Sequence, residues 1–216
     1  MTDTLCIVSG YLLGSINPAY IISRIKDFDI RDEGTGNAGA TNIGLQTGIG
    51  YGILALILDI LKAFAATYLP GQIFHRSVAV AAASGIACIL GHIYPVFMRF
   101  RGGKGTACIV GFGFGLKPLM ALPITAISML LGWLLGASTF VPVFASAVMI
   151  LYYAIWERSA VMSLLMVLLT VVLLLPRRKD MAVLRANITQ GNRKAQWFSL
   201  RKIKEQYRLR VKHRHK

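Results

Sequence analysis

A lysine set among three glycines, in the run Gly102-Gly103-Lys104-Gly105, is the part of this chain best suited to bind phosphate. Glycine has no Cβ atom, so the backbone N–H groups of this segment can approach an oxyanion closely. Lys104 adds a positive charge, and the apolar segment that begins at Thr106 offers the positive end of a helix. Because apolar segments lie on both sides, an anion bound here would lie at the edge of a membrane, within reach of a lipid headgroup or an activated acyl group.

A second polar loop, residues 34–42, contains three glycines and several short polar side chains. Its N–H groups and side chains, including Thr35, Asn37 and Asn42, suit a second site for an anion or a polyol. The alternative is an ordinary turn before a helix, with Thr41 or Asn42 as the helix cap. The loop by itself leaves both interpretations open.

Several charged residues lie close to these loops in the sequence. Asp59 and Lys62 are three residues apart inside an apolar stretch, so they share a helix face and can pair. Charges inside a membrane usually face a bundle interior or a cavity, although this pair could also lie near the membrane surface. His92 could transfer a proton or donate to a phosphate, or it could be structural. Arg99 and Arg101 suit phosphate binding, or they only set the orientation of the chain in the membrane.

The sequence favours neither a metal nor a cofactor. Its three cysteines, Cys6, Cys88 and Cys108, lie in or beside apolar segments and lack the spacing of metal ligands. We interpret them as small hydrophobic residues. The sequence also lacks a serine–histidine–aspartate set and a nucleotide-binding fingerprint.

The composition indicates a membrane protein. Of the 216 residues, 55% are hydrophobic and only 15% are charged, a balance that is rare in soluble domains. The apolar stretches approach the roughly 20 residues that a helix needs to cross a bilayer. We therefore predict one all-α integral membrane domain over residues 1–176. The four residues before the first apolar run lack a basic residue, so we expect that run to remain as a membrane span.

We predict about seven membrane helices. The first covers residues 5–22 and is kinked at Pro18. The remaining six are expected, in chain order, at residues 49–69, 78–98, 106–116, 119–135, 139–156 and 160–175. Lys117-Pro118 divides a long apolar stretch in two, because a single helix there would bury a lysine. If the short fourth span fails, we expect a re-entrant segment and five spans.

A basic tail, residues 177–216, carries fourteen lysine or arginine residues and two acidic ones, which is +12 of the chain's formal +15. We expect the tail to be cytoplasmic and to attract anionic membrane lipids. Nucleic-acid binding is not expected, because the tail has no recognition motif. An odd number of spans then places the 24–47 loop, the Gly-Gly-Lys-Gly segment and the tail on one side of the membrane.

Four motifs together resemble the bacterial acyl-phosphate:glycerol-3-phosphate acyltransferases. They are Gly14-Ser15-Ile16-Asn17-Pro18, the run from Gly36 to Asn42, the run from Leu58 to Lys62, and the run from Gly91 to Gly105. The likeness covers most of residues 10–110. It implies a seven-helix enzyme of the bacterial cell (inner) membrane that moves an acyl group from acyl phosphate to the 1-hydroxyl of glycerol 3-phosphate. The product would be lysophosphatidic acid, the first intermediate of phospholipid synthesis.

The resemblance also implies roles for individual residues. The Gly-Gly-Lys-Gly segment would hold a substrate phosphate, and Asn37 and Asn42 would shape the pocket. Thr35 replaces a serine of the family and keeps its hydroxyl. The predicted catalytic residues are Lys104, His92 and Thr35, and the predicted substrate-binding residues are Gly102, Gly103, Gly105, Thr106, Asn37, Asn42, Lys62, Arg101 and Asn187.

The chain departs from the family at two places. Leu45 stands where the family has an arginine expected to bind substrate phosphate. In the C-terminal motif, residues 184–187, only Asn187 of the family's histidine, glutamate and asparagine remains, although Arg185 or Arg193 could replace the missing positive charge. Losing one charge-assisted contact to a dianion costs about 1.5–3 kcal/mol. The acyl phosphate site therefore looks better preserved than the acceptor site.

Three other functions compete with this one. They are a diverged homologue that binds acyl phosphate or lipid without turnover, a transferase for a different acceptor, and a small transporter. An acyl phosphate is already activated, so a transferase needs only to place a hydroxyl at the acyl carbon and to stabilise the developing negative charge. Because the sequence shows no strong base, we expect a substrate phosphate oxygen, rather than Thr35 or His92, to take the proton. The acyl chain would lie between helices.

Overall fold

The computed structural model describes residues 2–135, 137–178 and 180–181, and within these ranges it contains helices and turns but no strand. This confirms the all-α prediction. The helices are α1 (Asp3–Ser15), α2 (Pro18–Ile25), α3 (Ala40–Thr47), α4 (Ile49–Tyr68), α5 (Val78–Ile93), α6 (Thr106–Leu116), α7 (Pro118–Leu134), α8 (Val141–Leu151) and α9 (Ala160–Leu174). Short helical turns at Leu69–Ile73, Val96–Met98, Ser138–Phe140, Tyr152–Trp156 and Leu175–Arg177 adjoin them.

Apolar helical segments lie where the seven spans were expected. Four are long and apolar enough to cross a membrane: Asp3–Ile25, Ile49–Ile73, Val78–Met98 and Ala160–Arg177. Three shorter ones are Thr106–Leu116, Pro118–Leu134 and Val141–Trp156. Leucines such as Leu61 on α4 and Leu164 on α9 are more than half exposed, which suits helices that face lipid.

The first span is broken near Pro18, as predicted. The break has a polar junction, because the Asn17 side chain accepts from the N–H of Tyr20 at 2.9 Å and donates to the carbonyl of Ala38 at 3.0 Å. Proline suits the first position of α2, where its missing N–H would have no partner in the helix. The break therefore connects the first span to the 34–42 loop.

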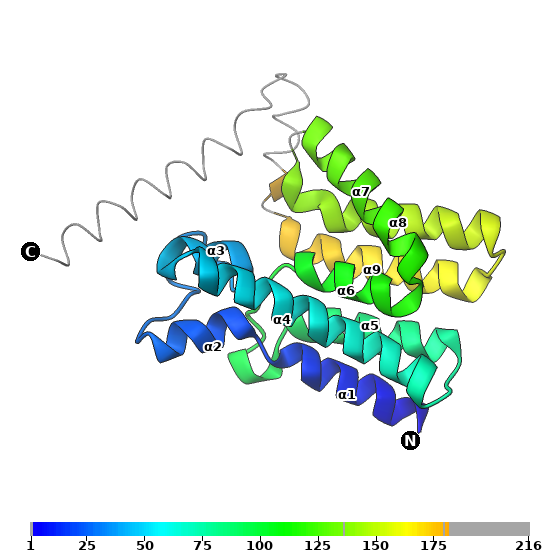
Figure 1. The fold of residues 1–216 in the computed structure, drawn as a ribbon, viewed down its shortest axis with the longest axis horizontal. Coiled ribbons are helices and arrows are strands. Elements are labelled where there is room, and N and C mark those ends of the chain that lie inside the picture. The colour runs from blue at the N-terminus through cyan, green and yellow to red at the C-terminus, as the bar shows by residue number, and fades with distance from the viewer. Residues whose placement is uncertain (1, 136, 179, 182–216) are drawn as a thin grey trace, which may run out of the picture.

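The helices approach closely at glycines. A Cβ atom on Gly14 of α1 would lie 2.0 Å from the carbonyl oxygen of Cys88 on α5. A Cβ atom on Gly111 of α6 would lie equally close, 2.0 Å, to the carbonyl oxygen of Ile60 on α4. Small residues at such crossings let membrane helices pack backbone to backbone. In Figure 1, α6 lies between α1, α4 and α5 on one side and α7, α8 and α9 on the other.

The polar loops gather at one end of the bundle. In Figure 1, α2, α3 and the final turn of α9 lie at the end opposite the N-terminus. The guanidinium of Arg31 spans the gap between two of these loops, because it pairs with Asp29 at 2.6 Å and donates to the carbonyl of Met98 at 2.9 Å. The hydrogen bond from Arg31 holds the pKa of Asp29 below its usual 3.8. The 24–47 loop and the segment that leads to Gly-Gly-Lys-Gly, which were expected on one side of the membrane, therefore lie together at one end of the bundle.

Candidate active site

The Gly-Gly-Lys-Gly segment folds back onto the end of α5. The N–H of Gly102 donates to the carbonyl of Ile93, and the N–H of Gly103 donates to the carbonyl of His92, each at 3.0 Å. A Cβ atom on Gly103 would lie 2.2 Å from Nε2 of His92 and 2.8 Å from the carbonyl oxygen of Ala38. Only glycine fits this position, so the segment is held between α5 and the 34–42 loop.

These backbone hydrogen bonds limit which N–H groups of the Gly-Gly-Lys-Gly segment can donate to an anion. The N–H groups of Gly102 and Gly103 already have backbone acceptors, so their expected role in binding phosphate directly does not fit this structure. The first turn of α6, which starts at Thr106, has N–H groups without a partner inside the helix. Gly105 precedes it at φ +72° and has no side chain to cap them. The start of α6, beside Lys104, is therefore the anion-binding position that the segment offers.

Lys104 is already paired. Its ammonium lies 2.6 Å from Oδ2 of Asp180, which follows α9, and about a quarter of each side chain is exposed. A carboxylate thus occupies the position at which an anion could pair with this lysine. Because the pair reaches solvent, an incoming dianion could replace the carboxylate without first opening the bundle.

Arg177 is a site residue that the sequence analysis missed, since it looks like the first residue of a basic tail. It is fully buried. Its Nη2 donates to the carbonyl of Lys104 at 2.7 Å and to the hydroxyl of Thr106 at 3.2 Å. Its Nη1 and Nε donate to the carbonyls of Leu173 at 2.5 Å and Thr139 at 2.6 Å. The guanidinium therefore fixes both the lysine backbone and the start of α6.

Asn42 organises the 34–42 loop. It is 1% exposed, and its amide nitrogen lies 2.9–3.1 Å from the carbonyl oxygens of Ile30, Glu33 and Asn37. Its Oδ1 accepts from the N–H of Thr35 at 3.1 Å. These contacts use the whole amide, so Asn42 shapes the loop and does not reach toward a substrate.

The other predicted residues of these loops are more accessible. Thr35 is exposed and Asn37 is half-buried, with the threonine hydroxyl 3.4 Å from the N–H of Asn37. Arg99 and Arg101 are exposed, and Arg99 has a φ of +52°. Asn187 lies outside the described residues, as does the rest of its motif. Thr35, Asn37 and the exposed Thr41 are therefore residues of the 34–42 loop whose side chains can meet a small polar ligand.

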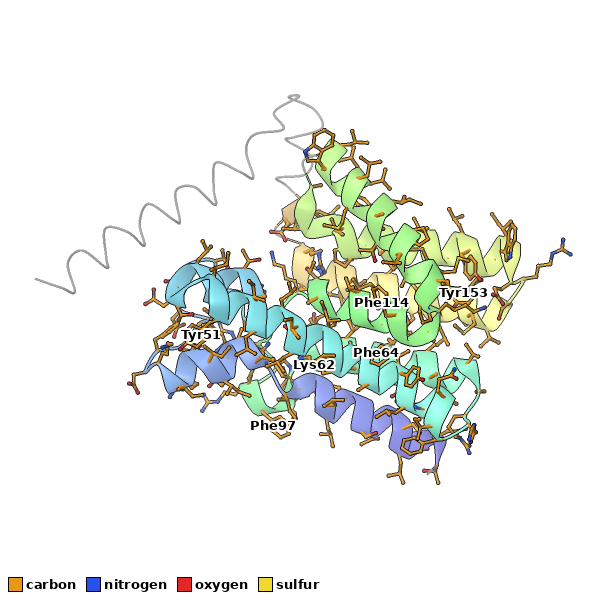
Figure 2. The ribbon with its side chains drawn as sticks, in the orientation of Figure 1. Tyr51, Lys62, Phe64, Phe97, Phe114 and Tyr153 are labelled. Carbon is orange, nitrogen blue, oxygen red and sulfur yellow. The ribbon has the colours of Figure 1, made fainter. Side chains whose placement is uncertain are left out.

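Asp59, Lys62 and His92 form a buried network beneath the Gly-Gly-Lys-Gly segment. The ammonium of Lys62 lies 2.8 Å from Oδ1 of Asp59 and 3.1 Å from Nδ1 of His92. It also donates to the carbonyls of Gly14 at 3.0 Å and Ile16 at 2.7 Å, at the end of α1. Figure 2 shows Lys62 in the middle of the bundle. The charges pair with one another inside the protein, as intramembrane charges usually do.

The network favours structural roles for Lys62 and His92. The three side chains are at most 7% exposed, and their polar atoms contact one another and the end of α1. His92 instead supports Gly103, which its Nε2 faces. Ligand atoms of Asp59, His92 and Cys108 lie within 4.8 Å of one another, a spacing compatible with a metal ion. The ammonium of Lys62 lies among the same groups and would repel a cation, so we interpret the cluster as an ion-pair network.

Comparisons with known proteins agree with this geometry. Residues 4–187 match the family model described as glycerol-3-phosphate acyltransferase. A glycerol-3-phosphate acyltransferase of Aquifex aeolicus is 41% identical over 54% of this chain and 60% of its own length. One of Geotalea daltonii is 32% identical over 86% of this chain and 95% of its own length. The chain thus matches less than two thirds of the Aquifex relative, and 58% of a relative from Halalkalibacterium halodurans.

Two crystal structures share the fold. They are those of PlsY (YgiH), an integral membrane glycerol 3-phosphate acyltransferase, in its glycerol 3-phosphate form and its lysophosphatidic acid form. The first has a TM-score of 0.76 and 28% identity, and the match covers 88% of this chain and 92% of that one. The second has a TM-score of 0.74 and 27% identity.

Proposed function

Because the chain belongs to the glycerol-3-phosphate acyltransferase family, we propose that it transfers an acyl group from acyl phosphate to the 1-hydroxyl of glycerol 3-phosphate. The product is lysophosphatidic acid. The observation that carries the proposal is the place of Lys104, beside the uncapped start of α6 and next to Gly103, which packs against Ala38 of the 34–42 loop. That arrangement provides one position for a phosphate and a neighbouring one for a polyol.

The protein is a multi-pass membrane protein, and we place it in the bacterial inner membrane with the catalytic end toward the cytoplasm. The positive charge gathered in residues 177–216 supports this orientation, because cytoplasmic segments carry an excess of lysine and arginine. Residues 1–176 form the main part of one catalytic domain, which also includes the buried Arg177 and the Asp180 that pairs with Lys104, and the rest of the tail binds anionic lipids at the inner surface. Glycerol 3-phosphate then reaches the site from the cytoplasm and the acyl donor reaches it from the bilayer.

The reaction needs positioning more than a catalytic base. The phosphate of the donor binds Lys104 and the start of α6, while Thr35 and Asn37 orient the acceptor. The acceptor hydroxyl oxygen bonds to the acyl carbon, and the bond from that carbon to the phosphate oxygen breaks. The hydroxyl proton passes to a phosphate oxygen of a substrate, and Lys104 stabilises the charge on the departing phosphate.

Purified protein supplied with palmitoyl phosphate and glycerol 3-phosphate should produce lysophosphatidate and inorganic phosphate in equal amounts. Tight binding of palmitoyl phosphate without any product would indicate the non-catalytic homologue. Product with another small alcohol, but none with glycerol 3-phosphate, would assign a different acceptor. Flux of either substrate across liposomes without product would indicate a transporter.

Leu45 weakens the acceptor site. It is half-buried on α3, three residues after Asn42, at the position where the resemblance to the family implies an arginine. Leu45→Arg is expected to lower the KM for glycerol 3-phosphate about ten- to hundredfold, because a charge-assisted contact to phosphate contributes about 1.5–3 kcal/mol. Leu45→Lys should lower this KM by a smaller factor, since a single ammonium cannot form the two parallel hydrogen bonds that a guanidinium makes with a phosphate. An unchanged KM in Leu45→Arg would show that another cation already binds the acceptor phosphate.

Asp180 competes with the donor phosphate for Lys104. Asp180→Asn is expected to lower the KM for palmitoyl phosphate by a factor between about 1.4 and 5, because partly exposed ion pairs contribute about 0.2–1 kcal/mol. The value of kcat should change less, since the lysine remains. Steady-state kinetics in detergent would measure both constants. A higher KM would mean that Asp180 holds the lysine in place for the phosphate.

A further inference from the structure

The break in the first span removes the helical donors of two carbonyl groups. In a continuous helix the carbonyl of Gly14 would accept from residue 18, but Pro18 has no N–H. The carbonyl of Ile16 would accept from Tyr20, whose N–H instead donates to the side chain of Asn17. Carbonyl groups without a donor are costly inside a membrane protein, so these two need a donor from another helix.

Lys62 of α4 is that donor. Its Nζ lies 3.0 Å from the carbonyl oxygen of Gly14 and 2.7 Å from that of Ile16. The same Nζ lies 3.1 Å from Nδ1 of His92 on α5, and the carboxylate of Asp59 at 2.8 Å balances its charge. A single buried ammonium therefore connects α1, α4 and α5.

Both ends of this connection continue into the glycine-rich loops. On the α1 side, the amide of Asn17 donates to the carbonyl of Ala38 in the 34–42 loop at 3.0 Å. On the α5 side, the carbonyl of His92 accepts from the N–H of Gly103 at 3.0 Å. The two loops also meet, because a Cβ atom on Gly103 would lie 2.8 Å from the carbonyl oxygen of Ala38. The contacts thus close a ring, which we call the contact ring, from the ammonium through both loops and back.

The contact ring joins the two places where the proposed reaction binds its substrates. The donor phosphate would bind beside Lys104, one residue after Gly103, and the acceptor would bind at Thr35 and Asn37, next to Ala38. Acyl transfer requires the reacting atoms to approach within about 3–3.5 Å, and a misplacement of about 1 Å can cost about 100-fold in rate. Each loop carries the groups for its own substrate, whereas the ring sets the distance between the loops.

We propose that Lys62 is a positioning residue for acyl transfer, which holds the acceptor loop and the phosphate segment at the distance that the reaction needs. The inference rests on the proposed acyltransferase function. Lys62 touches neither substrate and acts through Asn17 on one side and His92 on the other. Its loss should therefore lower kcat while each substrate still binds.

The variant that tests this role is Lys62→Met/Asp59→Asn. Methionine fills the space of the lysine without donating, and asparagine avoids leaving a buried carboxylate unpaired. We expect kcat to fall about tenfold or more, because the two loops are no longer held together. The Kd values for palmitoyl phosphate and for glycerol 3-phosphate, each measured alone, should stay within about threefold of wild type. A kcat within twofold of wild type in the folded variant, or weaker binding of only one substrate, would overturn the proposal.

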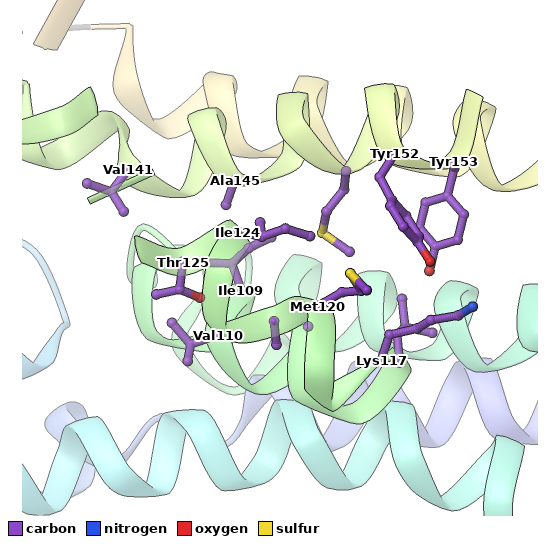
Figure 3. A pocket seen from close by; sticks show the side chains of 14 residues that line it. Ile109, Val110, Lys117, Met120, Ile124, Thr125, Val141, Ala145, Tyr152 and Tyr153 are labelled. Carbon is purple, nitrogen blue, oxygen red and sulfur yellow. The ribbon is translucent and has the colours of Figure 1, made fainter. Parts of the chain in front are cut away.

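The matched control is Lys117→Met, which removes another lysine that joins helices. Lys117 follows α6, at the end opposite Thr106, and pairs with Glu157 beyond α8. Figure 3 shows it near Tyr152 and Tyr153, and it contacts neither glycine-rich loop. We expect kcat and both Kd values to stay within about twofold of wild type. An equal loss of kcat in this control would mean that helix packing in general sets the rate, which contradicts a specific role for Lys62.

A cut elsewhere in the contact ring should have the same effect. In Asn17→Ser the hydroxyl still caps α2, but the side chain is too short to reach the carbonyl of Ala38. We expect kcat to fall with both Kd values retained. Combined with Lys62→Met/Asp59→Asn, the loss of kcat should be smaller than the product of the separate losses, because both changes open one ring. Losses that multiply would show that the two residues act independently.

A measurement without turnover separates this inference from the proposed function. The native cysteines are buried, so nitroxide labels can be attached to Thr41→Cys and Arg101→Cys, at exposed positions beside the two loops. Electron–electron resonance should give a broader label distance in the Lys62→Met/Asp59→Asn background than in wild type or Lys117→Met. Equal distributions in all three would overturn the positioning role. The expected broadening in a protein that makes no product would contradict the proposed function and retain Lys62 as the residue that holds the loops together.

Discussion

Lys104→Ala is expected to lower kcat/KM for palmitoyl phosphate by about 10²–10³-fold, the usual effect of removing one preorganised charge-stabilising group. The lysine lies beside the start of α6, next to Gly103, which packs against Ala38 of the 34–42 loop. Its loss removes attraction to the donor phosphate in the ground state and stabilisation of the departing phosphate in the transition state. We therefore expect kcat to fall and the KM for palmitoyl phosphate to rise.

The control for this variant is Lys26→Ala. Lys26 is an exposed lysine just after α2, at the same end of the bundle, and lies over the ring of Tyr51 at 4.5 Å. The Lys26→Ala variant should keep kcat and KM within about twofold of the wild-type values, as surface substitutions usually do. Initial rates of phosphate release, with both variants in the same detergent, provide the comparison. Full activity in Lys104→Ala would remove the central assignment of the proposed function.

Arg177→Leu is expected to lower both the stability and the activity severely. The guanidinium is fully buried and satisfies the carbonyls of Lys104, Thr139 and Leu173. Leucine would remove the guanidinium donor from one buried carbonyl, that of Leu173, and from two part-buried carbonyls, at about 1–3 kcal/mol for each acceptor that finds no other donor. A loss of at least about 3 kcal/mol corresponds to a drop in Tm of roughly 6–12 °C for a chain of this size.

Arg177→Lys separates positioning from stability. A lysine keeps the positive charge, but its single ammonium cannot reach Thr139 and Thr106 together as the planar guanidinium does. We expect a smaller drop in Tm, with kcat still reduced at least tenfold because the Lys104 backbone is no longer held. Arg178→Leu, at the exposed neighbouring position, should change neither Tm nor kcat. Loss of stability without any change in kcat of the folded fraction would make Arg177 purely structural.

The apolar segments could be predicted closely because membrane insertion depends on local composition. The second span was expected at residues 49–69 and the helix α4 is Ile49–Tyr68. Lys117-Pro118 divides the chain as expected, since α6 ends at Leu116 and α7 begins at Pro118. Proline favours the start of a helix, and a charged residue is costly within an apolar one.

The site residues could be predicted only in part from the sequence. The polar loops were found because glycine and short polar side chains are visible wherever they occur. The sequence could not show which N–H groups of these loops are free to bind a ligand. The N–H groups of Gly102 and Gly103 donate to carbonyls at the end of α5, and this contact depends on the fold. Lys62 was expected to bind substrate. Its carbonyl acceptors at Gly14 and Ile16 are more than 40 residues away in the sequence, so the sequence did not reveal that they bind its ammonium.

The sequence by itself determined the membrane class, the order of the apolar helices, the family and the two loops that carry the chemistry, since all of these depend on residue type and local spacing. Only the tertiary structure decided that Arg177 fixes the backbone of Lys104, that Asp180 occupies its ammonium, and that His92 supports the loop from within a buried network. The contacts of Arg177 and Asp180 with Lys104 join residues more than 70 positions apart, and those of His92 with Lys62 and Asp59 join residues 30 or more apart. Helix periodicity places a side chain on a face of its own helix, but the partner of that face is set by how the helices pack.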